Sequence, residues 1–357
     1  MDVHALRAQF PVLEAGIAYL NSGTDGPLPA AAAAAARQAL DDQEQAGRVS
    51  AHFERRFELQ DRLRAAYAAL VHAPTEEIAL TTSTSDGLGR VIAGLDLGPD
   101  DEILTTDEEH PGLLGPLLAA RRRGVSVRAV PFAHVAEAVT EATTLVALSH
   151  VSWVGGQVAA AGLADLDVPV ILDGAQGAGA IHVDPRALGC VAYAASGQKW
   201  LCGADGTGLL WLDPAFAEKL RLVSPSYLTF VDPSAGLQGG FKDTAARFDT
   251  PSLSREAVAL SLASAELLAA VGWEEVQRAG IANARRLADA LRERGRAVMP
   301  RGATTLVSWE DAYADQTRDR LAADGVIVRD LPGRALLRAS VGAWNDERDV
   351  ERLLSAV

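Results

Sequence analysis

Short runs of aliphatic and β-branched residues alternate with longer helix-like stretches along most of this 357-residue chain. The strand-like runs are residues 78–81, 102–105, 125–130, 144–148 and 168–172, and a helix-like stretch at 51–71 precedes them. Strands separated by helices build βαβ units, in which helices cover both faces of a mostly parallel sheet. The alternation therefore predicts an α/β fold with a large, mostly parallel-sheet domain over residues 16–250.

A different pattern begins near residue 227. Residues 227–251 are rich in glycine, proline, serine and aspartate, which is typical of a long loop. Shorter alternating elements follow: helix-like stretches at 255–271, 273–294 and 317–324, and strand-like runs at 304–309, 326–329 and 335–340. This order predicts a smaller α+β domain, formed by residues 251–357 together with residues 1–15.

Composition excludes several classes of function. With 48% hydrophobic and 22% charged residues, the chain has the composition of an ordinary globular protein. Its 33 basic and 47 acidic residues give a net charge of −14, and so acidic a surface repels nucleic acid. No run approaches the ~20 apolar residues that a membrane span needs, so no membrane partner is expected. The seven histidines show no metal-ligand spacing, so no metal is expected.

Cysteine usage indicates the compartment. The two cysteines, Cys190 and Cys202, form neither a CxxC pair nor a disulfide framework, which fits a reducing environment. The first residues of the sequence also lack the basic stretch and apolar segment of a secretory signal. A cytoplasmic protein is expected.

Polar residues follow three of the strand-like runs, where ligands gather in open parallel sheets. Residues 82–87 are Thr-Ser-Thr-Ser-Asp-Gly, and hydroxyl groups that enter a helix either bind a phosphate or only cap the helix. His110 follows the next run and can stack on a planar ligand. Asp173 directly follows the run 168–172, where a buried carboxylate needs a cation or strong donors, unless it only caps a helix.

A single lysine, Lys199, lies in the glycine-rich segment 193–208 beside Trp200. It follows Asp173 by 26 residues (199 − 173), about one βαβ step. A desolvated lysine loses its proton readily and then attacks aldehydes. The segment therefore indicates an amine nucleophile near the Asp173 carboxylate.

These residues, in this order and spacing, resemble the class V aminotransferase family of fold-type I pyridoxal-phosphate enzymes. The similarity is greatest to the isopenicillin-N-epimerase-like members, which adjoin the cysteine desulfurases and C–S lyases. It covers nearly the whole chain and rests on the segments 19–24 with Gly26-Pro27, 82–87, His110, 149–152, 173–176, 196–200, 247–250, and 337–340 with Trp344-Asn345.

The resemblance implies a set of roles around pyridoxal 5'-phosphate. Lys199 is the lysine that binds the cofactor aldehyde and then acts as a base at the substrate Cα. Asp173 holds the pyridine nitrogen in its protonated form, so that the ring withdraws electrons. Gln176 bonds the ring phenolate oxygen, and His110 stacks on the ring face.

The resemblance also implies residues for the phosphate and the substrate. The phosphate is bound by hydroxyl, amide and backbone groups of Thr84, Ser85, Ser196 and Gln198, and Thr250 reaches the phosphate of the neighbouring subunit in a homodimer. The implied partner is a small-molecule amino-acid substrate: Arg338 clamps its α-carboxylate with two parallel donors, and Asn21 and Trp153 contact it. Trp153 stands where desulfurase-like relatives often have asparagine, which suggests a bulkier and more apolar pocket or else a simple packing role.

Several reactions fit this set of residues. Desulfurases need a cysteine on a loop just before the arginine strand, and residues 326–334 contain none. We therefore expect a lyase that eliminates a β-substituent and yields pyruvate and ammonia. Class V transamination to a keto acid and epimerisation at Cα are the alternatives, and a non-catalytic protein with this cofactor fold is the alternative from another class. A dinucleotide-binding enzyme is not expected, because the glycines of 174–179 do not match GxGxxG.

Overall fold

Seven strands form the central sheet, in the order β2-β8-β7-β6-β5-β3-β4. The strands are β2 (Ile78–Thr81), β3 (Glu102–Thr106), β4 (Ser126–Val130), β5 (Thr143–Ser149), β6 (Val170–Asp173), β7 (Ala192–Ser196) and β8 (Gly208–Leu212). Strand β8 runs antiparallel to its two neighbours, and every other pair is parallel. The predicted α/β fold with a mostly parallel sheet is confirmed in this computed structural model, which describes residues 2–357. Met1, the first residue of the N-terminal segment that is predicted to belong to the small domain and to carry no secretory signal, lies outside the described residues.

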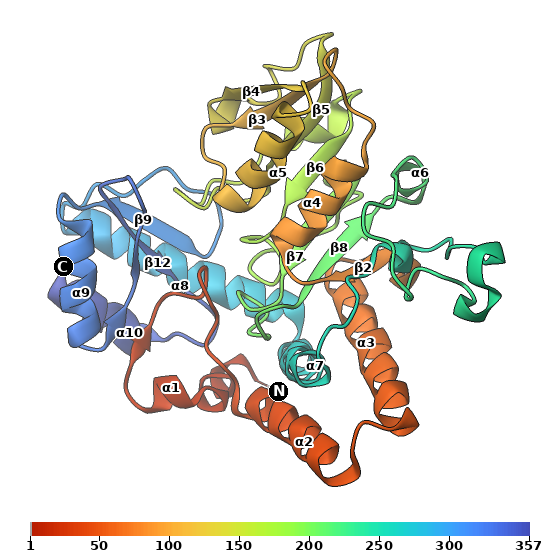
Figure 1. Ribbon diagram of the computed structural model, residues 1–357. Coiled ribbons are helices and arrows are strands. Elements are labelled where there is room, and N and C mark those ends of the chain that lie inside the picture. Colours follow the sequence, from red (N-terminus) through yellow and green to blue (C-terminus); the bar gives the residue numbers. More distant parts are fainter. Residues whose placement is uncertain (1) are drawn as a thin grey trace.

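Helices cover both faces of this sheet (Figure 1). Helices α4 (Thr84–Gly94), α5 (Pro111–Arg121) and α6 (Pro214–Ala217) pack on one face, against Ala147 and its neighbours. Helices α3 (Ser50–Leu70) and α7 (Arg255–Val271) lie on the other side, in the core that contains Leu148, and α2 (Ala30–Ala46) packs against α7. Successive strand residues face opposite sides, so a strand covered on both sides is an unbroken apolar run.

The C-terminal part forms a second, smaller sheet of order β11-β12-β9. Its elements are α8 (Trp273–Glu293), β9 (Leu306–Glu310), α9 (Ala314–Ala323), β10 (Val326–Ile327), β11 (Arg329–Asp330), β12 (Leu336–Ser340) and α10 (Glu347–Ala356). Near the N-terminus, α1 (Pro11–Glu14) is followed by β1 (Ala18–Tyr19), which pairs in parallel with β10. Residues near the two ends of the sequence are thus neighbours in the structure. The predicted division into a large and a small domain stays a prediction.

Most of the predicted elements are present, with differences at their ends. The predicted strand 326–329 is two short strands, because Val328 separates the pairing of β10 with β1 from that of β11 with β12. Strand β8, which begins at the end of the glycine-rich segment 193–208, is not among the predicted strands. Residues 227–251 form the predicted long loop, with short 3-10 turns and a bridge between Phe230 and Phe241.

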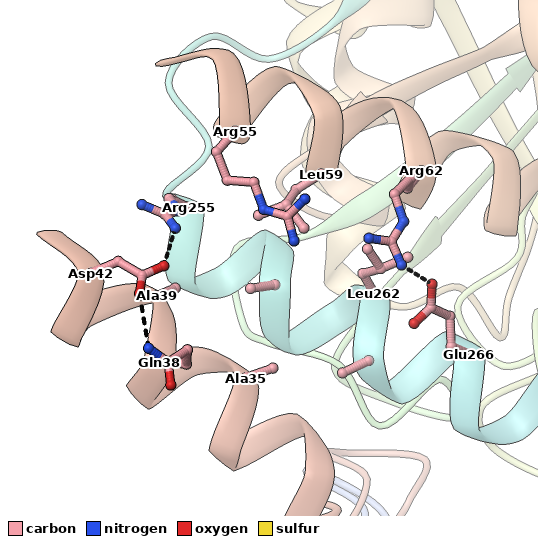
Figure 2. A pocket seen from close by; sticks show the side chains of 12 residues that line it. Ala35, Gln38, Ala39, Asp42, Arg55, Leu59, Arg62, Arg255, Leu262 and Glu266 are labelled. Carbon is pink, nitrogen blue, oxygen red and sulfur yellow. Dashed lines mark hydrogen bonds and ion pairs between the residues drawn. The ribbon is translucent and has the colours of Figure 1, made fainter. Parts of the chain in front are cut away.

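Two surface properties complete the description. No single helix within residues 2–357 has both the length and the apolar character of a membrane span; α7 and α8 meet that test only when joined, across an 83° bend. A groove of about 210 Å³ lies among α2, α3 and α7, with Ala35, Ala39 and Leu262 along its apolar part and Asp42–Arg255 and Arg62–Glu266 ion pairs at its ends (Figure 2). None of the predicted site residues lines it.

A buried ion pair fixes the end of the long loop to the sheet. Arg64 of α3 donates to both carboxylate oxygens of Asp249, at 2.9 and 2.8 Å, and to the carbonyl of Ile78 at 2.7 Å. The N–H of Leu80 also donates to Asp249, at 2.8 Å. Both charged side chains are more than nine-tenths buried, so each depends on the other for compensation.

We therefore expect Asp249→Ala to lower the free energy of unfolding by about 3–5 kcal/mol, since it leaves the Arg64 guanidinium buried and unpaired. Urea titration of the purified protein measures this change. Glu58→Ala, which removes an exposed partner of Arg55 on the same helix, is the matched control and should leave the midpoint unchanged. Equal midpoints for wild type and Asp249→Ala would contradict the assignment.

Candidate active site

The carboxyl ends of β2, β3, β5, β6 and β7 lie along one edge of the large sheet. Thr84 opens the helix after β2, and His110 stands in the loop after β3. Asp173 is the last residue of β6, and Lys199 follows β7 by three residues. The sheet order thus gathers at one edge residues that are up to 115 positions apart (199 − 84).

Asp173 is a buried carboxylate without a cationic partner in the protein. It is 4% exposed, and the N–H of Ala175 donates to its Oδ1 at 2.9 Å. Burial raises the pKa of Asp173, and the nearby Lys199 partly offsets that rise. Within residues 2–357 no basic side chain forms an ion pair with it. A charge buried in this way is costly until a cation arrives, so the site is suited to a cationic ring nitrogen.

Lys199 has the properties of an amine nucleophile. Its pKa is lowered to about 8, chiefly by burial and also by the charges of Arg338 and Arg329, while Asp173 and Asp25 act in the opposite direction. An appreciable share of the amine is therefore neutral near pH 8. The loop of residues 21–26 lies against this lysine, since the N–H of Gly26 donates to the carbonyl of Gln198 at 2.7 Å. A Cβ on Gly26 would stand 2.1 Å from the Lys199 carbonyl, so only glycine fits there.

His110 is neutral and has a defined tautomer. The N–H of Gly112 donates to its Nδ1 at 3.1 Å, which caps helix α5 and leaves the ring proton on Nε2. Burial lowers the pKa of His110 to about 4, and the positive charges of Lys199, Arg329 and Arg338 act in the same direction. The Trp153 ring lies edge-on to it, with 5.2 Å between the ring centres. The imidazole therefore offers an uncharged face.

The start of helix α4 carries the hydroxyl groups that the sequence predicts for a phosphate. Ser83 caps the helix by accepting from the N–H of Asp86 at 3.1 Å. The N–H of Thr84 donates to Ser196 Oγ at 3.0 Å, and the two hydroxyls are 2.7 Å apart. Ser85 is exposed at the same helix end. Free N–H groups and hydroxyls at a helix N-terminus suit a dianion.

The other three residues predicted to bind the cofactor have mixed surroundings. Gln176 donates to the carbonyl of Gly23 at 2.7 Å and accepts from the Trp200 indole at 2.9 Å, so much of its hydrogen-bonding capacity is already used within the protein. Gln198 has a buried Oε1 without a partner. Thr250 accepts from Arg90 at 3.0 Å and donates to Asp86 of its own chain, so its predicted reach to a neighbouring subunit stays a prediction.

Two arginines lie opposite each other on the smaller sheet. Arg338 of β12 is the direct register partner of Arg329 of β11. Arg338 is 1% exposed; its Nη1 donates to the carbonyl of Trp153 at 2.8 Å, while its Nε and Nη2 have no partner. Burial lowers its pKa to about 9, and Arg329 adds to that shift. Like charges directly opposite on adjacent strands are destabilising, so the pair is suited to an anionic ligand.

Arg329 is not among the site residues predicted from the sequence, where residues 326–334 stand out only because they contain no cysteine. The signal that could have found this residue is the Pro-Gly pair in residues 332–335, since a hairpin that turns over these four residues sets residue 329 opposite residue 338.

Asn21, predicted to contact the substrate, bridges to Ser340 at the end of β12 and accepts from the Thr24 hydroxyl at 2.8 Å. Ser340 Oγ is buried without a partner, and a Cβ on Gly23 would stand 2.7 Å from it. Trp153 lies between His110 and Arg338, with its indole N–H also unpartnered. The structure thus brings Asn21 and Trp153 to the same region as Arg338.

These groups fit pyridoxal phosphate, the cofactor that the sequence resemblance implies. The donors at the start of α4 would hold its phosphate, the unpaired Asp173 carboxylate its ring nitrogen, and Lys199 its aldehyde. The unpartnered polar atoms of Gln198, Ser340 and Arg338 provide further sites for hydrogen bonds. In the described part of the chain, no three His, Cys, Asp or Glu side chains are arranged to hold a metal ion.

Comparison with known proteins gives a family match. The model of the family described as aminotransferase class-V matches residues 18–353. A probable cysteine desulfurase of Pseudomonas aeruginosa is 28% identical over 404 residues, covering 98% of this chain and 96% of that protein. One of Methanothermobacter thermautotrophicus is 28% identical over 229 residues, so in that alignment the chain spans only 56% of the relative.

The solved structures include two of one similar protein, each with a TM-score of 0.91. One is a mutant of C-DES with glycine covalently linked to the PLP cofactor; it is 26% identical and covers 98% of both chains. The other is the cystine C–S lyase C-DES with its reaction product cysteine persulfide; it is 27% identical and covers 97% of this chain and 98% of that one.

We expect pyridoxal phosphate followed by borohydride to fix one adduct, at Lys199, as read by peptide mass spectrometry. The neutral amine is the attacking form, so the rate should rise with pH through about 8 and then level off. Lys199→Ala should carry no adduct at that position. The chain has only two other lysines, Lys219 and Lys242, and Lys219→Ala is the control that should label as wild type does. Labelling spread evenly over all three would contradict the assignment.

Proposed function

This chain belongs to the aminotransferase class-V family of pyridoxal-phosphate-dependent enzymes that act on amino acids, and we propose that it is a C–S lyase for disulfide amino acids of the cystine type. The observation that carries the proposal is the pair of guanidinium groups, Arg338 and Arg329, directly opposite each other and close enough to Lys199 to lower its pKa. Two cations at one amino-acid site match a substrate with two carboxylates.

The residues divide the work of β-elimination among them. Pyridoxal phosphate, when bound, supplies the electron-withdrawing ring that stabilises negative charge at the substrate Cα. Asp173 keeps the ring nitrogen protonated, because a buried carboxylate favours a cation beside it. Lys199, with a pKa of about 8, takes the Cα proton and delivers a proton again later. Arg338 orients the α-carboxylate with its unpartnered Nε and Nη2.

Arg329 is the group that selects a second anionic end. Its Nη1 donates to the hydroxyl of Thr24 at 3.2 Å, and its side chain is half-buried. Cystine carries a carboxylate at each end, one for each guanidinium. The similarity to C-DES, whose structure is described as that of a cystine C–S lyase, supports the same substrate class.

The proposed reaction balances without an acceptor. The Cα–H and Cβ–S bonds of cystine break, and cysteine persulfide leaves with both sulfur atoms. The remaining aminoacrylate takes up one water and becomes pyruvate and ammonia. No keto acid, oxidant or reductant is consumed.

Transfer of sulfur to a cysteine of this chain has no support. Cys190 and Cys202 are both buried, at 5% and 1% exposure, and burial raises the pKa of each thiol. A thiol accepts sulfur as an accessible thiolate, which neither residue offers. Release of a small persulfide therefore agrees better with the chain than a desulfurase reaction does.

We expect the holoenzyme to release pyruvate from L-cystine without any keto acid, as measured with lactate dehydrogenase. Arg329→Ala should lower kcat/KM for cystine roughly 10–100-fold, the value of one or two charge-assisted hydrogen bonds. The same change should alter kcat/KM for S-(ethylthio)cysteine, a disulfide without the second carboxylate, by less than about threefold. Arg338→Ala should impair both substrates.

Three outcomes would count against this function. Absence of pyruvate from every disulfide and thioether of cysteine, together with amino transfer to a keto acid, would establish transamination instead. Exchange of the Cα proton with inversion and no pyruvate would establish epimerisation. Equal losses for both disulfides in Arg329→Ala would remove the second-carboxylate assignment.

The proposal also includes a cytoplasmic homodimer. The two free, buried thiols agree with a reducing compartment. The segment that contains Val231, Leu237 and Phe241 projects from the body (Figure 1). These side chains are 70%, 102% and 51% exposed, and apolar side chains gathered at an exposed segment mark an interaction surface. A second copy of this chain is the partner proposed for that surface.

We expect the purified protein to have the mass of a dimer by light scattering at micromolar concentration. Leu237→Asp places a charge on the segment at a position fully exposed in the single chain. It should therefore shift the equilibrium towards monomer without lowering the midpoint of urea unfolding of the monomer. A wild-type protein that stays monomeric up to 100-fold higher concentration would contradict the dimer.

A further inference from the structure

Glu109, which the reaction above does not use, is a buried carboxyl with three hydrogen-bond donors. It is 5% exposed and lies between the ends of β3 and β5. The Thr106 hydroxyl donates to Oε1 at 2.5 Å. Ser149 donates to Oε2 twice, through its N–H at 2.9 Å and its hydroxyl at 2.6 Å. The carboxyl thus joins the loop after one strand to the end of the next strand in the sheet.

Packing alone does not account for this side chain. Within residues 2–357 no basic side chain forms an ion pair with Glu109, and burial raises its pKa to about 7, with the charge of Asp173 acting in the same direction. An apolar residue of similar size would fill the same space without that cost. What the carboxyl adds is a set of directed hydrogen bonds.

One of the two segments that Glu109 joins carries His110, and the other pairs with the strand that ends at Asp173. His110 is the next residue in the chain, and its ring caps helix α5 through Gly112. Ser149 is the register partner of Asp173 across β5 and β6, and the N–H of His150 donates to the Asp173 carbonyl at 2.8 Å. A change in the position of the Glu109 carboxyl would therefore alter the positions of both His110 and Asp173.

We propose that Glu109 is a positioning residue, whose three hydrogen bonds hold the His110 imidazole and the Asp173 carboxylate at a fixed separation in the cofactor site. The role goes beyond the proposed function, because it applies to any reaction that this site carries out. It rests on hydrogen-bond geometry rather than on the charge of Glu109. Glutamine at this position can keep the geometry: its carbonyl accepts from Ser149, and its amide donates to Thr106.

The test reads the His110 ring directly, in protein without added substrate. In protein labelled with ¹⁵N-histidine, the His110 signals, assigned by their loss in His110→Asn, should show the Nε2–H tautomer at pH 7. Glu109→Ala should give a mixture of tautomers and a pKa of His110 nearer its ordinary value than about 4. Glu109→Gln should keep the wild-type signals.

Steady-state kinetics and cofactor binding supply the second readout. In Glu109→Ala we expect kcat to fall about 10–100-fold with KM changed less than about threefold, and the cofactor to dissociate faster. Glu109→Gln should stay within about threefold of wild type in both. Glu77→Gln, which alters another buried glutamate paired with Arg186 and Trp211, is the control: it can lower stability but should not change the His110 signals.

Two results would overturn the proposal. One is a folded Glu109→Ala protein whose His110 signals and kcat equal those of wild type. The other is a Glu109→Gln protein as impaired as Glu109→Ala, since the charge and not the geometry would then matter. If Glu109→Ala does not fold, Ser149→Ala gives the same test, because it removes one of the three donors and should shift the His110 signals in the same direction. The NMR result stands whether or not cystine is the substrate.

Discussion

The architecture of this molecule depends on two buried charged side chains, Asp173 and Arg338, whose charges are not compensated by ion pairs in the described part of the chain. Among the described residues 2–357, the buried Asp173 carboxylate at the edge of the large sheet has no ion-pair partner, and the buried Arg338 guanidinium of the smaller sheet has two unpartnered nitrogens. Each costs stability in the isolated chain, and the continuous apolar cores on both faces of the sheet supply the stability that this requires. A cationic ring nitrogen beside Asp173 and a substrate carboxylate beside Arg338 would supply the missing charges, so the cost of burying these two groups would favour the binding of both ligands.

The site also depends on both ends of the chain. Strand β1 pairs with β10, Asn21 bridges to Ser340, and Gln176 of the large sheet donates to Gly23. The loop of residues 21–26 therefore touches the Lys199 segment on one side and the arginine strands on the other. These candidate site residues therefore come together only when both ends of the chain are folded.

The sequence predicts the large sheet well and the smaller one less well. Strands such as β5 are buried on both faces, so each is an unbroken apolar run that stands out between helices. Lys199 and Asp173 are predictable for a similar reason, because a charged residue is conspicuous at the end of such a run. Arg329 lies on a strand of only two residues, which is identified by its pairing with β12 in the folded protein. Two residues are too few to show the alternating pattern by which a strand is recognised in a sequence. The contacts of Gln176 with Gly23 and Trp200 likewise join segments 153 and 24 residues apart, beyond the reach of any local pattern.

The burial of both cysteines has a consequence for the durability of the catalyst. Disulfides and persulfides exchange with accessible thiolates, and mixed disulfides form where such thiolates exist. Cys190 and Cys202 lie in hydrophobic clusters, with their thiols held protonated. A chain built this way can work in a solution of sulfur-rich metabolites without being modified by them, and reducing agents are not needed to keep its own sulfur atoms intact.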